Sequence, residues 1–533
     1  MRRRLLFVLL PLALGLFACS RCGKSAAGTP DLARALPRNA EAVLLVPQLG
    51  NLGEKMAVLQ RLKLASFLAQ LQGFATAEEY LNAVVAQAGV DFRSKEDLRK
   101  AGIDPDLGLG VALLPGNEAY SVVGVRDAKA LEATVARLAR DRLGAGTASS
   151  SEKDGVRVIG FAPAEGAAPQ LGLAISGKLA FLAAGPSARR LGTFAALAPR
   201  ASLAEDSALN AALKRLPVDR DLLVYLPGEV VREQHDPLRG ATFTGKLTND
   251  GLVVRADVPG VSVQQALDAL AQKPSANLFG VLPRDAFALL RFSGEPSLLA
   301  PVLPYLLGER VSRTLAEAGF DAKADALDNL KPGAVAALSL SPQVRLAGGM
   351  PALDVRRTNP FRFVHLVAAA RVKDAAKAAA LLRKLPPLAP KLGAKLEPAE
   401  RGGHPVLLAS YAQGEGTHLA LAGDTLLLAA PEPRLVEALG RVTAAAEGSS
   451  PLSDPTLLKS LDERAVALVV DLRRLAESVK ALPADAWGVG GFAMKATTVR
   501  WLEATDDLRA VTAGLSVKEN TVQGELTLRL SPP

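Results

Sequence analysis

The residues best suited to chemistry near the start of this 533-residue chain are its two cysteines, Cys19 and Cys22. Their C-x-x-C spacing can carry redox chemistry or a metal when it opens a helix of a thioredoxin-like unit. Here the pair follows an apolar stretch and precedes residues 23–30, whose Gly, Ser, Ala and Pro content is typical of a flexible tether. We therefore expect no redox or metal site, and no disulfide framework in the folded part.

The first eighteen residues have the pattern of an export signal. Arg2, Arg3 and Arg4 precede an apolar run at residues 5–17, which is too short for a membrane helix of roughly 20 residues. The following residues 16–19, Leu-Phe-Ala-Cys, resemble the lipobox of bacterial lipoproteins, although Phe17 is bulkier than that family usually carries.

The resemblance implies that the Cys19 thiol carries diacylglycerol, that the chain is cut before Cys19, and that acyl chains such as palmitate anchor it to a membrane. We expect a signal peptide at residues 1–18, a tether at 19–30 and lipidation at Cys19. Ser20, in place of Asp, indicates the outer membrane, facing the periplasm or the cell surface. The alternative is cleavage elsewhere, which would release a soluble periplasmic protein. Cys22 is either a second acylation site or without a role.

Two segments approach the phosphate-binding P-loop, at residues 172–178 and 240–246. In both, leucine (Leu179 and Leu247) follows the lysine, where the motif needs Ser or Thr for Mg²⁺. Both also lie in a predicted strand-turn-strand pattern without a helix N-terminus to receive phosphate. We expect no nucleotide site.

Other reactive side chains also lack a supporting pattern. The four histidines have no close ligand spacing, and we expect them at the surface or at sheet edges, with His418 opposite Tyr411; they are His235, His365, His404 and His418. Ser150 and Lys153 fit a Ser-Lys spacing but lie in an expected polar loop. The acidic pairs 78–79 and 506–507 are sequence neighbours whose side chains diverge. The prediction is no catalytic residue, no cofactor, no metal and no enzyme.

The amino-acid composition disfavours two classes of partner, nucleic acids and sugars. Apolar residues make up 49% and charged residues 22%, as in ordinary globular proteins. The net charge of +9 falls to +6 without the three signal arginines, and no basic run is flanked by aromatic residues. A nucleic-acid partner is therefore not expected. Aromatic residues are scarce at 4%, with Trp487 and Trp501 as the only tryptophans, which disfavours sugar binding.

An internal repeat organises the rest of the chain. Residues 36–45 (LPRNAEAVLL) recur at 282–291 (LPRDAFALLR), 246 residues later. The same spacing relates 175–184 to 421–430 and 222–226 to 468–472. Three matches at one spacing and in one order predict a gene duplication.

Each copy is predicted to be an α+β domain in which an antiparallel sheet carries its helices on one face. In the first copy the strands are expected at 42–46, 109–114, 120–125, 156–161, 171–175, 179–183, 222–226, 241–248 and 252–258. Its helices are expected at 78–88, 128–138, 187–197 and 207–216. Because residues 179–183 and 426–430 are apolar at consecutive positions, both faces of those strands should be covered.

The predicted domains are a first repeat at 31–258, a linker segment at 259–281 containing a helix at 262–272, and a second repeat at 282–533. The second repeat carries an insertion near 482–499, which contains Trp487 and three glycines.

The lipobox and the Leu-Pro-x-Asn/Asp-Ala opening before a strand, in a long Ala/Leu-rich body, resemble large bacterial surface proteins grouped as a domain of unknown function. That resemblance implies no activity and no catalytic residues. We expect a lipid-anchored, non-enzymatic envelope protein whose duplicated domains bind another molecule or scaffold an assembly. The expected partners are an envelope protein or an apolar ligand. The alternatives are a carrier of an apolar ligand such as lipid and, third, a hydrolase. A scaffold should have an exposed apolar patch, a carrier an apolar cavity, and an enzyme converging polar groups.

Overall fold

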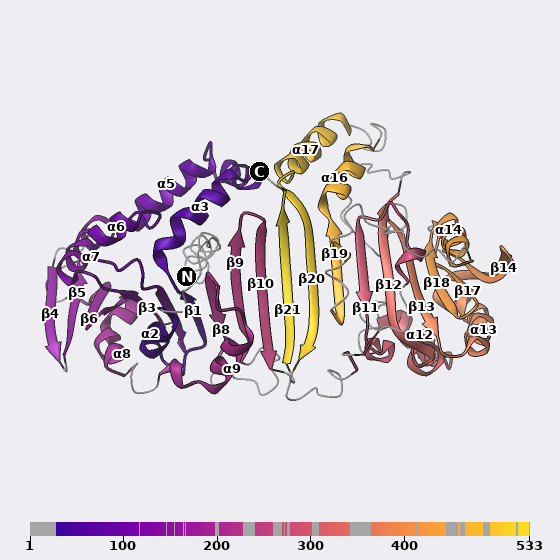
Figure 1. Ribbon diagram of the computed structural model, residues 1–533, viewed down its shortest axis with the longest axis horizontal. Helices are drawn as coiled ribbons and strands as arrows, with labels where there is room; N and C mark the ends of the chain where they lie inside the picture. The colour runs from indigo at the N-terminus through magenta and orange to yellow at the C-terminus, as the bar shows by residue number, and fades with distance from the viewer. Residues whose placement is uncertain are drawn as a thin grey trace. The chain divides into compact units, whose positions relative to one another are not determined.

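The computed structural model describes residues 28–531 except at a few gaps, which are 117, 145–146, 154, 164, 166, 198–201, 228–239, 260–268, 271, 274–277, 301–308, 342–363, 412–413, 444–456, 459–463, 483–490 and 519–520. The chain divides into two compact units (Figure 1). Unit 1 ends at Pro259, and unit 2 comprises Gly260–Ser531.

Unit 1 contains one antiparallel sheet. Its described strands are ordered β10-β9-β8-β1-β2-β3-β7-β6-β5-β4 across the sheet. Their bounds are β1 Ala42–Val46, β2 Leu109–Leu114, β3 Glu118–Gly124, β4 Thr147–Lys153, β5 Val156–Ala162, β6 Leu171–Ser176, β7 Leu179–Ala184, β8 Leu222–Tyr225, β9 Thr242–Thr248 and β10 Gly251–Pro259.

The helices of unit 1 lie in the connections between its strands. They are α2 Gly28–Ala35, η1 Leu49–Asn51, α3 Leu52–Arg61, α4 Lys63–Leu71, α5 Ala77–Ala88, α6 Lys95–Lys100, α7 Ala128–Leu143, η2 Gly185–Arg190, α8 Leu191–Leu197, η4 Leu203–Glu205 and α9 Ser207–Arg215. Side-chain caps begin several of them: the Asp127 carboxylate accepts from Lys129 and Ala130 at the start of α7. Gly144, in the left-handed conformation, ends that helix.

These helices cover both faces of the sheet. On β1, Val43 and Leu45 face the core formed with α2, α8 and α9. Val46 faces the opposite way, into a second core with η1, α3 and α6, and α7 extends that side over β5–β7. The α+β class and the antiparallel sheet are confirmed, but the prediction of helices on one face is wrong. The physical reason is that the strands are apolar at consecutive positions, so each face needs a cover.

Unit 2 also contains one antiparallel sheet, with its described strands ordered β21-β20-β19-β11-β12-β13-β18-β17-β15-β14. Their bounds are β11 Ala288–Phe292, β12 Leu330–Leu340, β13 Val364–Val372, β14 Ala394–Arg401, β15 His404–Tyr411, β17 His418–Ala422, β18 Thr425–Ala430, β19 Val466–Asp471, β20 Leu508–Lys518 and β21 Thr521–Leu530, and the short β16 Gly414–Glu415 pairs with β15.

The helices of unit 2 include α14 Glu432–Thr443, which packs on the main core, and α13 Ala375–Lys384, which packs on the opposite face of β15, β17 and β18. The other helical segments are η5 Phe279–Val281, η6 Pro296–Leu299, α12 Glu309–Glu317, the π-helix η7 Ala322–Ala326, η8 Leu327–Asn329, η10 Pro386–Leu392, α16 Leu472–Lys480 and α17 Gly491–Ala504. Both units therefore place helices on both faces of a sheet.

Each strand in the order of unit 1 has a counterpart at the same place in the order of unit 2. For example, β1 lies between β8 and β2 as β11 lies between β19 and β12. That this likeness arose by gene duplication stays a prediction.

Several predicted local features differ from the structure. Helix α2 already begins at Gly28, so residues 28–30 of the expected tether are helical, and Pro30 is tolerated because it lies in the first turn. The expected loop around Ser150 is strand β4, a polar strand at the end of the sheet order, where polar residues protect the edge. The predicted linker helix at 262–272 falls mostly outside the described residues. The predicted insertion at 482–499 is part of a longer connection between β19 and β20 that contains α16 and α17.

Candidate functional site

The most unusual surface in the described residues is one side of the unit 2 sheet. Five leucines there are 37–45% exposed, one on each of five neighbouring strands. We call this surface the open face; its exposed members are Leu290 on β11, Leu338 on β12, Leu468 on β19, Leu515 on β20 and Leu526 on β21.

Strand register places these leucines on one side of the sheet. Leu290 is directly opposite Leu468, and Ala288, two residues before Leu290, is opposite Leu338. In turn Leu468 is opposite Ala513, which is opposite Leu526. Partners across a ladder share a face, as do residues two apart on a strand. The five side chains therefore form one continuous surface.

The open face carries no charged side chain on the described strand positions from β21 to β12. The positions between the exposed leucines are apolar, and they include Ala336, Val466, Val470, Val511, Ala513 and Leu528. An antiparallel sheet with a water-facing side normally alternates apolar and polar residues. Exposed apolar surfaces of this kind are typical of interaction sites in other proteins.

The corresponding surface of unit 1 is covered. Leu222 and Leu44 precede Leu468 and Leu290 by the repeat spacing of 246 residues. Leu222 is 5% exposed and packs with Leu49, Leu52 and Leu98, with Leu44 packed against the same cluster. The cover comes from the connection between β1 and β2, residues 47–108, which contains η1 and helices α3 to α6.

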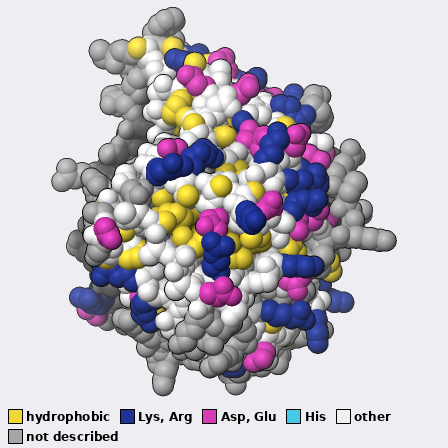
Figure 2. All heavy atoms as spheres, turned by 90° about the vertical axis from the view of Figure 1, so that its left-hand side faces the viewer, with side chains coloured by type: hydrophobic (Ala, Val, Ile, Leu, Met, Phe, Trp, Pro, Cys, Tyr) yellow, Lys and Arg dark blue, Asp and Glu magenta, His cyan; other side chains and the backbone are white. Residues whose placement is uncertain are grey.

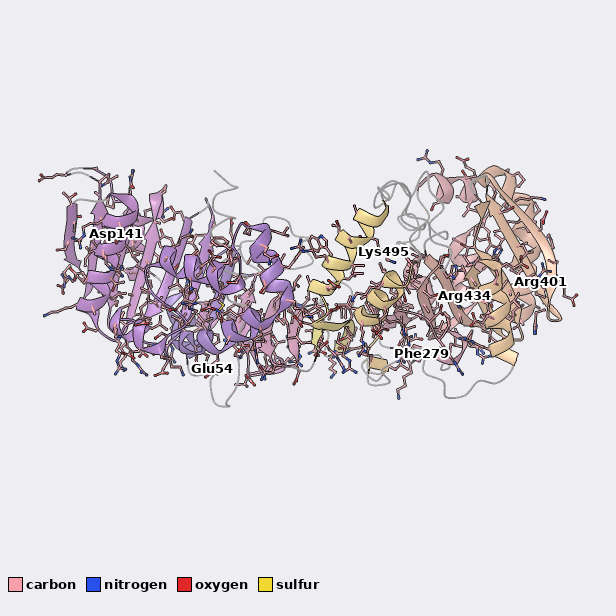
Figure 3. All side chains as sticks on the ribbon, turned by 90° about the horizontal axis from the view of Figure 1, so that it is seen from above. Glu54, Asp141, Phe279, Arg401, Arg434 and Lys495 are labelled. Carbon is pink, nitrogen blue, oxygen red and sulfur yellow. The ribbon has the colours of Figure 1, made fainter. Side chains whose placement is uncertain are left out.

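The connections of unit 2 leave the open face exposed. Between β11 and β12 the chain has residues 293–329, far fewer than its counterpart in unit 1. In Figure 1, α16 and α17 lie at the upper ends of β19 and β20, and α16 contacts β20 and β12. Figure 3 shows Lys495 on α17, whose ammonium donates to the carbonyl of Leu482, 2.9 Å away, and so ties α17 to the end of α16.

Cys19 and Cys22 lie outside the described residues, as does His235. In the described part of the chain, no helix combines the length and apolar character needed to cross a bilayer. The lipidation of Cys19 therefore stays a prediction.

The other histidines are dispersed. The prediction that His418 lies at the surface or an edge is wrong: it is buried, and its Nδ1 accepts a hydrogen bond from the Ala409 amide at 3.0 Å. It lies near Ala409, not opposite Tyr411, because the short strand β16 occupies the partner positions of Ser410 and Tyr411. His365 accepts from Arg434, labelled in Figure 3, at 3.1 Å. The described residues contain no group of three or more possible metal ligands.

The remaining sequence candidates have structural roles. Residues 172–178 lie in the β6–β7 hairpin, where Gly177 has a positive φ, so this segment is no phosphate loop. Glu79 belongs to the first turn of α5, and its carboxylate accepts from the Ala75 amide. Ser150 and Lys153 lie on β4.

Charge is mixed over the surface at the β4 end of unit 1. Figure 2 shows basic and acidic side chains interspersed there with apolar ones. Exposed ion pairs such as Lys100–Glu96 and Arg157–Glu132 illustrate the pattern. This face offers no single-sign surface of the kind that nucleic acids need.

Sequence reasoning missed the open face, although its signal was present. Strand β19 has five consecutive apolar residues, Val466 to Val470, and β12 has five more at 334–338. That pattern predicts cover on both faces. In the structure, only one face of these strands is covered.

The sequence matches no protein-family model and no curated protein. Among solved structures, it is similar to crystal form I of TP0453, with 11% identity over 49% of this chain and 81% of that chain. The TM-score of 0.26 is too low to establish a shared fold.

Proposed function

We propose that this chain is a lipid-anchored, non-enzymatic envelope protein that binds another envelope protein through the open face of unit 2. The observation that carries the proposal is the continuous set of exposed leucines on five adjacent strands without a charged residue among them. Removing such a surface from water yields about 25 cal/mol per Å² of apolar area, which favours a bound partner.

Anchoring at Cys19 is the first part of the proposal. Replacing Cys19 by Ala should abolish labelling with radioactive palmitate and leave the unprocessed precursor in the cell. Cys22→Ala is the matched control and should keep the label and the mature size. A Cys19→Ala protein that still fractionates as a labelled, mature membrane species would contradict lipidation at this residue.

Partner binding is the second part. The full chain, tagged and solubilised from the envelope in detergent after cross-linking, should capture a protein partner. A Leu290→Ser/Leu468→Ser variant should lose that partner. The control is Leu68→Ser/Leu71→Ser on α4, which removes two leucines of unit 1 that are more exposed than Leu290 and Leu468. Equal capture by all three proteins would contradict a role for the open face.

A carrier of an apolar ligand is the second candidate, favoured by one observation. The exposed members of the open face are all leucines, whereas protein interfaces typically depend on Trp, Tyr and Arg anchors. Acyl chains need only aliphatic contact. Mass spectrometry of the lipids that copurify with the wild type and with the two double variants distinguishes the candidates. If only Leu290→Ser/Leu468→Ser loses a bound lipid, and no protein is captured, the result supports the carrier.

A further inference from the structure

Arg220 of unit 1 is a buried cation without a described partner. It lies in the short connection between α9 and β8 and is only 8% exposed. Its Nε and Nη1 atoms are buried and form no hydrogen bond. Burial of an unpaired guanidinium is costly, and native structures normally supply a counter-charge.

The carboxylates next to Arg220 in the sequence are already engaged by lysines. Asp221 pairs with the buried Lys55 at 3.5 Å and accepts from the Leu247 amide at 2.8 Å. Lys55 also donates to the Leu247 carbonyl at 3.1 Å. Asp219 pairs with Lys246 at the surface. Asp221 and Asp219 are therefore both paired with lysines, and neither is a partner of Arg220.

A nearby arginine shows how the same unit satisfies a guanidinium. Arg215 donates from Nε and Nη2 to the two oxygens of the buried Asp257, at 2.8 and 2.6 Å. Arg220 has no such partner, and burial alone lowers its pKa, without a carboxylate acting in the opposite direction. The contrast indicates that the counter-charge of Arg220 comes from outside the described residues.

We propose that Arg220 is the centre of an anion-binding site that takes an oxyanion, a phosphate or a carboxylate. Guanidinium donors match the oxygens of both groups, and charge-assisted hydrogen bonds would satisfy the two buried nitrogens. The source is either a free anion or the phosphate of a lipid headgroup. This site lies in unit 1 and does not depend on the open face of unit 2.

Thermal unfolding of the full mature chain in detergent tests the site. Increasing inorganic phosphate should raise the Tm of the wild type, because a ligand that binds only the folded state stabilises it. Arg220→Met should abolish the response and, without phosphate, melt at or above the wild-type temperature because it removes an unpaired buried charge. Arg220→Lys keeps the charge without the guanidinium geometry and should bind phosphate at least tenfold more weakly.

Lys246→Met is the control, since it removes a neighbouring surface cation and should respond to phosphate as the wild type does. The second ligand is the short-chain lipid dihexanoyl phosphatidylglycerol. If this lipid raises the Tm in an Arg220-dependent way and inorganic phosphate does not, the site binds a lipid headgroup. If inorganic phosphate raises the Tm, the site binds a free anion. The proposal is overturned if phosphate, acetate and the short-chain lipid leave the wild type unchanged, or if they shift the wild type and Arg220→Met equally.

Discussion

The two units share one strand order but differ in what covers one side of the sheet. In unit 1, the connection between β1 and β2 contains η1 and α3–α6, and it buries Leu222. In unit 2, the shorter connection leaves the corresponding Leu468 exposed. Leu44 and Leu222 of unit 1 correspond to Leu290 and Leu468 of unit 2, so the difference in exposure lies in the connections. The same side of the sheet is therefore packed into the core of unit 1 and exposed to water in unit 2.

The largest expected effect comes from breaking the buried ion pair that holds α3 against the sheet of unit 1. Lys55 of α3 pairs with Asp221 in a nearly fully buried site, and Lys55→Met would leave that carboxylate uncompensated. Removing one partner of a buried pair costs about 3–5 kcal/mol. Urea unfolding followed by far-UV circular dichroism should show this loss, whereas Lys246→Met at an exposed pair should cost no more than about 1 kcal/mol.

The unfolding of the two units can be separated because both tryptophans, Trp487 and Trp501, belong to unit 2. Tryptophan fluorescence therefore reports unit 2, and circular dichroism reports both units. A Lys55→Met protein whose fluorescence transition moved while unit 1 stayed unchanged would contradict this assignment.

Matched leucines provide the second test. Leu222→Ala removes a buried side chain and should destabilise unit 1 by roughly 2–5 kcal/mol, as core truncations do. Leu468→Ala, at the equivalent position, should change the stability of unit 2 by no more than about 0.5 kcal/mol, because it is exposed. The same urea experiment gives both values, and equal losses would mean that the open face is covered in solution.

A third difference is a titratable group in the core of unit 1. Tyr120 stacks on Phe194 of α8 with ring centroids 3.9 Å apart, and burial, reinforced by the nearby Glu118 carboxylate, raises its pKa to about 12. Because the pKa is raised on folding, the protonated hydroxyl stabilises the fold at pH values below about 10, and this contribution is lost between about pH 10 and 12.

The loss should amount to about 2–3 kcal/mol, since each pKa unit corresponds to about 1.4 kcal/mol. Urea unfolding of the wild type and of Tyr120→Phe across this pH range gives the free energy of unfolding at each pH. The contribution of Tyr120 is the difference between the losses of the two proteins. The hypothesis is wrong if the Phe variant loses as much stability as the wild type does.

The smallest effect on stability is expected at the open face itself. Leu290→Ser/Leu468→Ser should leave the free energy of unfolding within about 0.5 kcal/mol per substitution and lower the fluorescence of a bound apolar dye such as bis-ANS. Leu68→Ser/Leu71→Ser on α4 should retain most of the dye signal. Unchanged dye binding by the first variant would show that these leucines do not form one surface.

Much of the local structure could be predicted from the sequence. The strands β1 and β2 have the expected bounds, and the β9–β10 hairpin turns at Asn249 and Asp250 as their turn chemistry indicates. The sequence pattern does not predict helices α3, α4 and α6, and it predicts a loop where the structure has the polar strand β4. In that strand, backbone pairing with β5 overrides the low strand propensity of serine and glutamate.

By itself, the sequence determined the α+β class, the antiparallel pairing and the apolar character of both sides of the central strands, because these follow from short-range pattern and turn chemistry. Only the tertiary structure decided which apolar side is covered. Leu222 and Leu468 lie in similar strand sequences, and their different exposure depends on whether a distant connection packs over them. The burial of Arg220 is likewise a tertiary property. The sequence shows that the residue is a cation, but not that its Nε and Nη1 atoms are buried without a hydrogen-bond partner. Burial is set by contacts between segments far apart in the chain, and no local pattern contains that information.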